Sequence, residues 1–175
     1  MTGSGPALKT ERPMQARQKV FAHLDEMGVS YRVSEHPAVY TIEEMENLQL
    51  DKLGGIVKNL FLRDAKGRRH FLVMMRQDKK VDLKGLQAKI GSTPLRFASE
   101  ERLARHLGLE KGAVSPLGVI NDEEKAVEIL MDNDLKGYEL LGVHPNDNTA
   151  TIWLPLADLE KILIGHGNPV TYLDL

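Results

Sequence analysis

The chain has 175 residues, of which 42% are hydrophobic, 15 are glycine, 8 are proline and none is cysteine. A length in the usual range of roughly 100–200 residues per domain favours one domain with one core. The lack of cysteine excludes a thiol nucleophile, a disulfide framework and a cysteine zinc site. No apolar run approaches the roughly 18 residues of a membrane span, and no basic-then-apolar leader is present. We therefore expect a cytoplasmic protein with no membrane partner.

The formal net charge of −2, from 23 Lys and Arg against 25 Asp and Glu, argues by itself against a nucleic-acid binder. The charge is unevenly distributed, however. The segment from Lys58 to Lys89 holds ten basic and three acidic residues, a net charge of +7, whereas the rest of the chain carries −9. A basic segment on an acidic body suits a protein with one face toward phosphates. It is equally typical of the solvated face of a hairpin and a helix.

The first elements follow from apolar spacing. Residues 1–13 are rich in Gly, Ser and Pro, so we expect a flexible lead-in before a single domain over residues 14–175. Apolar residues at helical spacing predict a helix over Met14–Met27, ended by Gly28. Alternation then predicts a short strand at Tyr31–Val33.

The next segment predicts a helix and a hairpin. Thr41 and Glu44 have the Thr-x-x-Glu spacing of a capping box, which opens a helix to about Leu50. Two strands follow, Gly55–Arg63 and Arg69–Arg76, joined by a turn that contains a glycine. The second strand is apolar on both faces, which predicts a central position in the sheet.

The second half of the chain continues the mixture of helices and strands. We expect helices at Leu83–Ile90, Glu100–Leu107 and Leu156–Ile164, and strands at Ala126–Met131 and Thr149–Leu154. Strands and helices do not alternate regularly. This predicts an α+β fold with a mixed, largely antiparallel sheet that curls toward a barrel and is flanked by helices.

Lys58 is the most informative single residue. Alternation along the strand places it with Ile56 and Leu60 on one face and places Asn59 on the other. Burial of an unpaired ammonium group costs several kcal/mol in effective terms, so Lys58 must have an anionic partner or lie at the open end of the sheet. An edge lysine whose stem covers apolar surface and whose ammonium group reaches water explains the pattern equally well.

Two loops could also contribute catalytic or ligand-binding groups. Gly112–Gly118 contains small residues between glycines and a proline, which lets backbone N–H groups approach an ester or oxyanion. His144–Asn148 contains an imidazole and two amides that could bind a polar ligand or orient a water molecule. Ordinary turns have the same compositions, so neither loop identifies a site by itself.

The sequence lacks the motifs of other common metal, nucleotide and catalytic sites. The remaining histidines show no metal-ligand spacing: His23, His36, His70, His106 and His166. The sequence has no dinucleotide-binding glycine motif, no P-loop and no Gly-x-Ser-x-Gly elbow. We therefore expect no metal and no cofactor.

Four segments, in this order and spacing, resemble the YbaK/prolyl-tRNA synthetase-associated domain family: His36–Glu44, Val57–Leu62, Gly112–Pro116 and His144–Asn146. The likeness runs from about residue 15 to the end of the chain. Within the family, the chain is most similar to the free-standing, PrdX-type deacylases that hydrolyse Ala-tRNA(Pro). It has no room for a synthetase core.

The resemblance implies the family's fold and a trans-editing activity, the hydrolysis of the ester between a wrong amino acid and the terminal adenosine of tRNA(Pro). It implies that Lys58 clamps the phosphate and ribose of the 3′ end, with Asn59 beside it. It also implies that the loop Gly112–Pro116 shapes the pocket, and that His144 and Tyr40 are the pocket histidine and the helix-entry tyrosine.

The resulting expectations are these. The catalytic residues are Lys58, Gly112 and His144, and the substrate-binding residues are Tyr40, Asn59, Ala113, Ser115, Pro116 and Asn146. The 3′ end of tRNA(Pro) binds along Lys58–Lys89, prolyl-tRNA synthetase or an elongation factor is a further partner, and the protein is a monomer.

An aminoacyl ester is already activated, so its hydrolysis needs a positioned water and a stabilised oxyanion more than a strong nucleophile. The substrate's own ribose hydroxyl and backbone carbonyls could orient the water without a general base. A proline site cannot strongly exclude alanine, because lost methylenes cost only about 1–3 kcal/mol, so a second, smaller pocket is needed. Two alternatives stay open: a Cys-tRNA(Pro) or Ser-tRNA deacylase, and a non-catalytic tRNA- or synthetase-binding module.

Overall fold

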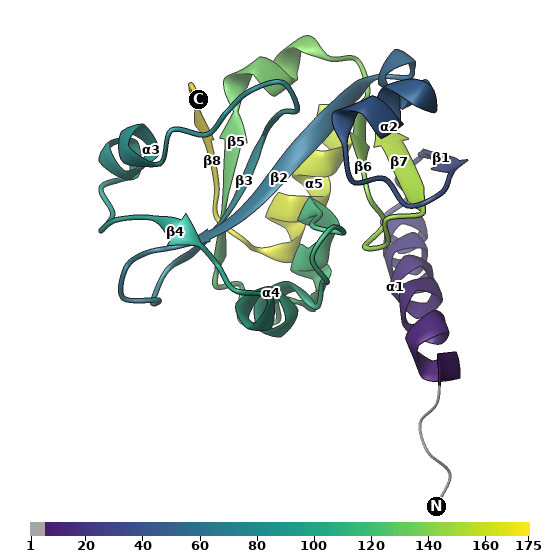
Figure 1. The fold of residues 1–175 in the computed structure, drawn as a ribbon, viewed down its shortest axis with the longest axis horizontal. Helices are drawn as coiled ribbons and strands as arrows, with labels where there is room; N and C mark the ends of the chain where they lie inside the picture. The colour runs from purple at the N-terminus through teal and green to yellow at the C-terminus, as the bar shows by residue number, and fades with distance from the viewer. Residues whose placement is uncertain (1–5) are drawn as a thin grey trace, which may run out of the picture.

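The computed structural model describes residues 6–175 as one mixed sheet of eight strands flanked by helices (Figure 1). The strands are β1 (Arg32–Glu35), β2 (Gly55–Arg63), β3 (His70–Arg76), β4 (Arg96–Phe97), β5 (Val127–Asp132), β6 (Leu141–Val143), β7 (Ala150–Leu154) and β8 (Val170–Leu173). The α-helices are α1 (Pro6–Glu26), α2 (Ile42–Asn47), α3 (Leu83–Ile90), α4 (Glu100–Leu107) and α5 (Leu156–His166).

The strand order is β1-β7-β6-β2-β3-β5-β8, with β4 paired to the end of β2. Strand β2 organises the sheet. Along one edge it runs antiparallel to β3, from Val57 opposite Arg76 to Arg63 opposite His70. Along its other edge its first residues pair in parallel with β6 and its last residues pair antiparallel with β4. The pairs β1–β7 and β6–β7 are antiparallel, and β3–β5 and β5–β8 are parallel.

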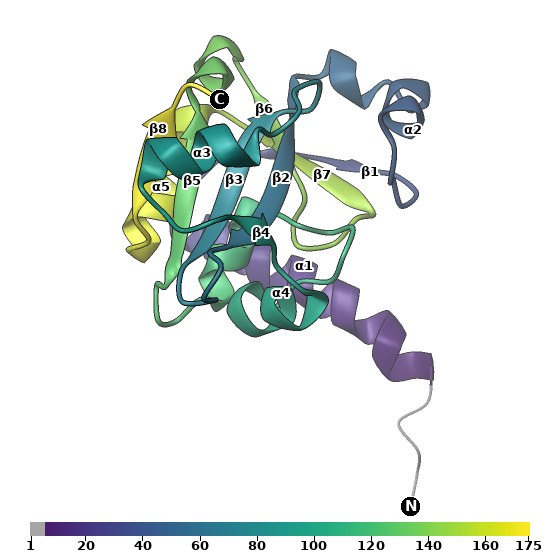
Figure 2. The ribbon, with the colours of Figure 1, turned by 60° about the vertical axis from the view of Figure 1, so that its left-hand side comes forward.

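Helices cover both faces of the sheet (Figure 2). Apolar residues of α1, α4 and α5 pack with one face of the central strands, where Phe61, Leu72 and Met74 are buried. Leu86 of α3 packs with the other face, which includes Phe71 and Met75. Both faces of β3 are therefore covered, which confirms its predicted central position.

Local capping explains why several elements have the predicted bounds. Strand β2 and helices α3 and α4 begin and end at the predicted residues. Helix α4 starts where the Ser99 side chain accepts the N–H of Arg102, and it ends at Gly108, whose φ of 64° suits glycine. At α2, Thr41 accepts the N–H of Glu44, while the Glu44 carboxylate accepts the N–H of Tyr40. The predicted capping box is thus present with its second hydrogen bond moved one residue toward the N-terminus.

The N-terminal helix is longer than predicted. Helix α1 begins at Pro6 rather than at Met14, so residues 6–13, which we expected to belong to a flexible lead-in, are helical. Residues 1–5 of that predicted segment lie outside the described residues. Short strands β4, β6 and β8 were also not predicted.

Candidate functional site

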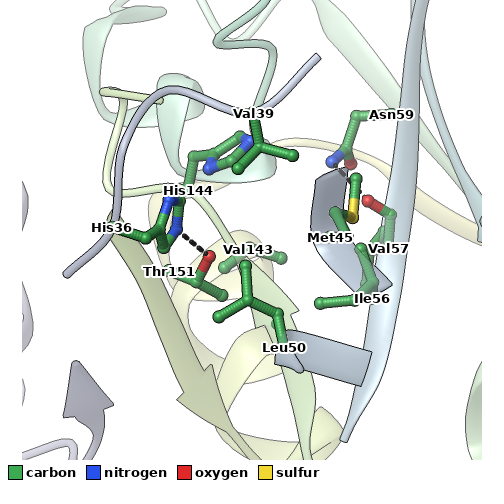
Figure 3. A pocket seen from close by; sticks show the side chains of 11 residues that line it. His36, Val39, Met45, Leu50, Ile56, Val57, Asn59, Val143, His144 and Thr151 are labelled. Atoms are coloured by element: carbon green, nitrogen blue, oxygen red, sulfur yellow. Dashed lines mark hydrogen bonds between the residues drawn. The ribbon is translucent and has the colours of Figure 1, made fainter. Parts of the chain in front are cut away.

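A small cavity of about 40 Å³ lies between the segment before α2, the start of β2, and strands β6 and β7 (Figure 3). Its walls are mainly apolar. Of the predicted site residues, Asn59 and His144 line it. The remaining lining residues are His36, Val39, Met45, Leu50, Ile56, Val57, Gly142, Val143 and Thr151, none of which carries a carboxylate.

The His144 imidazole has a fixed orientation. Its Nδ1 lies 3.0 Å from the carbonyl oxygen of Ala150, and a carbonyl only accepts, so Nδ1 carries the proton and Nε2 has a free lone pair. Burial lowers the pKa of His144 below its ordinary value, and the neighbouring His36 lowers it further, against the opposing effect of the Ala150 hydrogen bond. His144 is therefore neutral at pH 7, with Nε2 able to accept a hydrogen bond.

His36 is a cavity residue that sequence reasoning did not assign to the site. Its Nδ1 donates to the carbonyl of Pro37 (2.8 Å), so its Nε2 accepts from the hydroxyl of Thr151 (2.8 Å). Figure 3 shows this hydrogen bond at the wall of the cavity, close to His144. The signal available in the sequence was the place of His36 at the start of the first of the four segments. Sequence reasoning considered His36 only as a metal ligand, for which it lacks the spacing.

Asn59 contributes a second acceptor. Its Nδ2 donates to the carbonyl of Val57 at 3.4 Å, which places the amide oxygen on the other side of the group. That oxygen is buried and has no hydrogen-bond partner among the described residues. The small cavity thus combines apolar walls with two acceptors, Asn59 Oδ1 and His144 Nε2. A ligand with a small apolar part and a donor such as an ammonium group or water suits this arrangement.

The loop His144–Asn148 holds the Gly112–Gly118 loop in place. The Ser115 hydroxyl donates to the backbone carbonyl of His144 at 2.6 Å, and Asn146 Nδ2 donates to the carbonyl of Leu117 at 3.2 Å. The two loops that the sequence singled out are therefore hydrogen-bonded to each other. Ser115 and Pro116 are buried behind the site and line neither of the two cavities described here.

The same loop also holds the segment before α2 and helix α1. Asn148 pairs with the backbone of Val39, accepting its N–H at 3.3 Å and donating to its carbonyl at 2.8 Å. Asp147 forms an ion pair with Arg17 of α1 at 3.2 Å, and both side chains are about 90% buried or more. Loop His144–Asn148 is thus the common support of the site.

A large cavity of about 570 Å³ lies on the other side of this support. Three predicted substrate-binding residues line it: Tyr40, Ala113 and Asn146. The Tyr40 ring lies against Gly112, where a Cβ would come within 2.9 Å of Tyr40 Cε1. Because Gly112 also has a φ of +92°, any larger residue there is disfavoured twice, by the close ring and by the backbone conformation.

Lys58 lines neither cavity. Its ammonium group donates to the carbonyl of Lys79 at 2.7 Å. Lys79 is itself paired with the buried Asp132 at 2.7 Å and with Asp134, and the hydrogen bond that Lys79 donates to Asp132 raises the pKa of Lys79. The ammonium group of Lys58 is therefore satisfied by a backbone carbonyl, and not by an anion.

The basic segment is partly neutralised within the fold. Arg69 pairs with Glu128, Arg76 with Asp78, and Lys79 with Asp132. In Figure 1 the β2–β3 turn and α3, which carry most of the remaining cations, lie on the left, whereas α2, β6 and β7 lie on the right. The free cations of this segment are thus concentrated away from the small cavity.

Among the described residues no helix has the length and apolarity to cross a membrane, and no cluster of three or more His, Asp or Glu side chains has the arrangement of a metal site.

The chain is similar to known proteins over most of its length. The sequence model of the aminoacyl-tRNA editing domain matches residues 36–162. The chain is 55% identical to the prolyl-tRNA editing protein ProX of Acetoanaerobium sticklandii, over 93% of this chain and 99% of that protein. It is 35% identical to prolyl-tRNA synthetase associated domain-containing protein 1 of Danio rerio, over 86% and 83% of the two chains.

Comparison of the fold with solved structures agrees with these sequence matches. A crystal structure described as a candidate trans-editing enzyme for prolyl-tRNA synthetase superposes with a TM-score of 0.72 at 25% identity, covering 91% of this chain and 97% of the other. Both this agreement and the position of the matched residues, which include both loops and the small cavity, point to one assignment. The chain belongs to the aminoacyl-tRNA editing domain family.

Proposed function

We propose that this protein is a trans-editing deacylase that hydrolyses the ester of mischarged Ala-tRNA(Pro). The observation that carries the proposal is the small cavity, about 40 Å³ with apolar walls and two acceptors, in a chain that is 55% identical to a prolyl-tRNA editing protein over nearly its full length. We further propose that residues 14–175 act as one editing domain and as a monomer, with tRNA(Pro) as the macromolecular partner.

The aminoacyl group is proposed to occupy the small cavity. The alanine methyl contacts Val39, Leu50 and Ile56, all of which are buried. The α-ammonium group is a donor and suits the unpartnered oxygen of Asn59. A larger proline ring would require these packed walls to move, so size is the basis of discrimination.

Hydrolysis is proposed to proceed mainly by positioning. Neutral His144 can accept a hydrogen bond from the attacking water at Nε2, together with the ribose hydroxyl of the substrate and nearby backbone carbonyls. Backbone groups of the loop that begins at Gly112 are proposed to stabilise the developing oxyanion. Because the ester is activated, no strongly basic side chain is required.

Lys58 is proposed to clamp the phosphate of the 3′ end. Its ammonium group must first leave the carbonyl of Lys79, to which it is bound at 2.7 Å. A charge-assisted contact with phosphate is stronger than one with a neutral carbonyl, which favours this exchange when tRNA binds. The free cations of Lys58–Lys89 would then face the tRNA at a greater distance from the ester.

The experiment is single-turnover hydrolysis of Ala-, Cys- and Ser-charged tRNA(Pro), with and without prolyl-tRNA synthetase. We expect rapid release of alanine. Hydrolysis of the cysteinyl ester alone would replace the alanine assignment with the cysteine one. If no ester is hydrolysed while tRNA(Pro) still binds, the protein is a binding module and the deacylase proposal is wrong.

A further inference from the structure

We infer that Lys79 is a positioning residue for Lys58. Its ammonium group occupies the buried carboxylate of Asp132, which Lys58 could otherwise bind, and its backbone offers Lys58 a neutral carbonyl instead. Lys58 is thereby kept without an anionic partner and stays available for an anionic ligand. That this ligand is the phosphate of the tRNA 3′ end rests on the proposed function, whereas the placement of Lys58 can be measured without it.

Lys58 and Asp132 lie in one row across three neighbouring strands, β2, β3 and β5, which Figure 2 shows side by side. Lys58 is opposite Met75, and the parallel pairing of β3 with β5 runs to Met74 opposite Met131, one residue before Asp132. Residues opposite one another point to the same face, so Lys58 and Asp132 share with Met75 the face that α3 covers. Two strand spacings of about 4.8 Å separate them, which a lysine side chain can span.

Lys79 already occupies the carboxylates at this end of the face. Its Nζ lies 2.7 Å from Asp132, whose side chain is only 1% exposed, and it also pairs with Asp134. The Nζ of Lys58 donates instead to the backbone carbonyl of Lys79, at 2.7 Å. One residue thus blocks the anionic partners of Lys58 with its side chain and satisfies the Lys58 ammonium group with its backbone.

Asp132 is the acid that Lys58 would bind if the charge of Lys79 were removed. Asp134 is half-exposed and lies 3.7 Å from Arg76, so it keeps a cation nearby without Lys79. Asp132 has Lys79 as its only cation among the described residues. A buried carboxylate without a cation is unfavourable, and a charge-assisted hydrogen bond is stronger than one to a neutral carbonyl. Loss of the Lys79 charge should therefore draw Lys58 to Asp132.

Lys79 suits this role because both of its ends are fixed. Its backbone N–H donates to the carbonyl of Arg76 at 3.1 Å, in the turn after β3. Its ammonium group donates to Asp132 and to the backbone oxygen of Leu175, each at 2.7 Å. The carbonyl that accepts from Lys58 thus belongs to a residue that is anchored to the end of β5 and to the segment after β8.

The first test is the crystal structure of Lys79→Met, which removes the ammonium group and keeps a long side chain. We expect the Nζ of Lys58 within about 4 Å of a carboxylate oxygen of Asp132, and no longer on the carbonyl of residue 79. Lys79→Arg keeps the charge and should leave Lys58 in place. If Lys79→Met does not fold, Lys79→Gln makes the same change in charge and keeps a donor for Asp132.

The second test is kinetic. In Lys79→Met, the capture of Lys58 should lower kcat/KM for Ala-tRNA(Pro) about 10–100-fold, mainly through a higher KM, because Lys58 is proposed to act in binding. Lys79→Arg should recover most of this loss. Lys161→Met, at an exposed lysine of α5 outside the basic segment, makes the same change in net charge and should retain full activity.

Double variants separate positioning from a purely structural role. Asp132→Asn added to Lys79→Met removes the acid that captures Lys58 and should restore kcat/KM to within about threefold of the unchanged protein. Glu26→Gln, at the exposed end of α1, restores the same net charge and should not rescue Lys79→Met. Lys79→Met added to Lys58→Ala should lower kcat/KM no further than Lys58→Ala alone.

The inference is wrong if Lys58 stays on the carbonyl of residue 79 in folded Lys79→Met or Lys79→Gln. It is also wrong if Lys79→Met lowers kcat/KM equally with and without Lys58, or if Asp132→Asn rescues no better than Glu26→Gln. If Lys58 moves to Asp132 while kcat/KM is unchanged, Lys79 does position Lys58 and the proposed phosphate clamp fails. If the unchanged protein hydrolyses no ester, the proposed function fails and the crystal structures decide the inference.

Discussion

The two faces of β2 differ in how their polar side chains are satisfied, and the neighbours Lys58 and Asn59 represent them. On one face, Lys58 donates to the carbonyl of Lys79, and Lys79 is paired with Asp132. On the other face, Asn59 Oδ1 is buried with no partner among the described residues, and Nε2 of His144 has a free lone pair. Buried polar groups are normally satisfied, so unsatisfied ones concentrated around a cavity indicate a site prepared for a ligand.

The largest effect is expected at His144. His144→Ala removes the acceptor that we propose for the attacking water, and the single-turnover rate on Ala-tRNA(Pro) should fall about 10²–10³-fold. His106→Ala, at a half-buried histidine on α4, is the matched control and should retain the rate. Equal rates for the two variants, with folding verified by circular dichroism, would remove His144 from the site.

Asp132→Asn tests the opposite face. It leaves Lys79 without its buried anionic partner and should destabilise the fold by about 3 kcal/mol in urea unfolding. The half-exposed Asp134 provides the comparison, since Asp134→Asn should cost only about 0–1 kcal/mol. A small loss of unfolding free energy in Asp132→Asn would mean that the ion pair of Lys79 with Asp132 does not stabilise the Lys58 side of β2.

Lys58→Ala tests whether Lys58 binds the substrate or only supports the fold. If it clamps phosphate, kcat/KM for Ala-tRNA(Pro) should fall about 10–100-fold, the value of one charge-assisted contact, with little change in stability. Lys161→Ala, at an exposed lysine of α5 outside the basic segment, should retain full activity. Full activity in Lys58→Ala would assign the residue to the scaffold together with Lys79.

The smallest effect is expected in the pH profile. Because the pKa of His144 is lowered below 6.5, its neutral form persists as pH falls through 6.5, and the deacylation rate should decline only at lower pH. His36 contributes to this lowering, so His36→Gln should move the decline to slightly higher pH. A rate that falls already above pH 7 would contradict a neutral His144.

The lowered pKa of His144 also makes the stability of the fold depend on pH. The unfolded chain takes up the His144 proton near pH 6.5, whereas the folded protein takes it up only at lower pH. Stability linked to His144 is therefore complete above 6.5 and is lost as pH falls below it. His70, whose pKa burial lowers to about 4, should act in the same direction between about pH 6.5 and 4.

Sequence reasoning succeeded where structure is determined locally. The bounds of α3 and α4 follow from capping residues such as Ser99 and Gly108, and β3 follows from its continuous apolar run. It failed where a strand forms only because it pairs with a segment distant in the sequence. Strand β6 has three residues and β8 has four, too few to show a pattern of apolar and polar residues. The prolines at positions 6 and 13 concealed the first turns of helix α1.

The site shows the same division. The sequence singled out both loops as well as Asn59 and His144, because their residue types and the family resemblance were visible; the structure places Asn59 and His144 at the small cavity, and their roles stay predictions. It did not place Lys58 on the carbonyl of Lys79, nor His36 at the cavity wall, because each position depends on a partner distant in the chain. The separation of the predicted residues between two cavities was likewise not readable from spacing.

The central claim, that the small cavity selects the amino acid by size, is tested most directly by comparing single-turnover rates on Ala-tRNA(Pro) and Pro-tRNA(Pro). The protein should strongly prefer the alanyl ester. Leu50→Ala, which enlarges the cavity, should accelerate hydrolysis of the prolyl ester and narrow the ratio of the two rates about tenfold or more, whereas the exposed Leu53→Ala should leave it unchanged. An unchanged ratio in a folded Leu50→Ala variant would contradict the account.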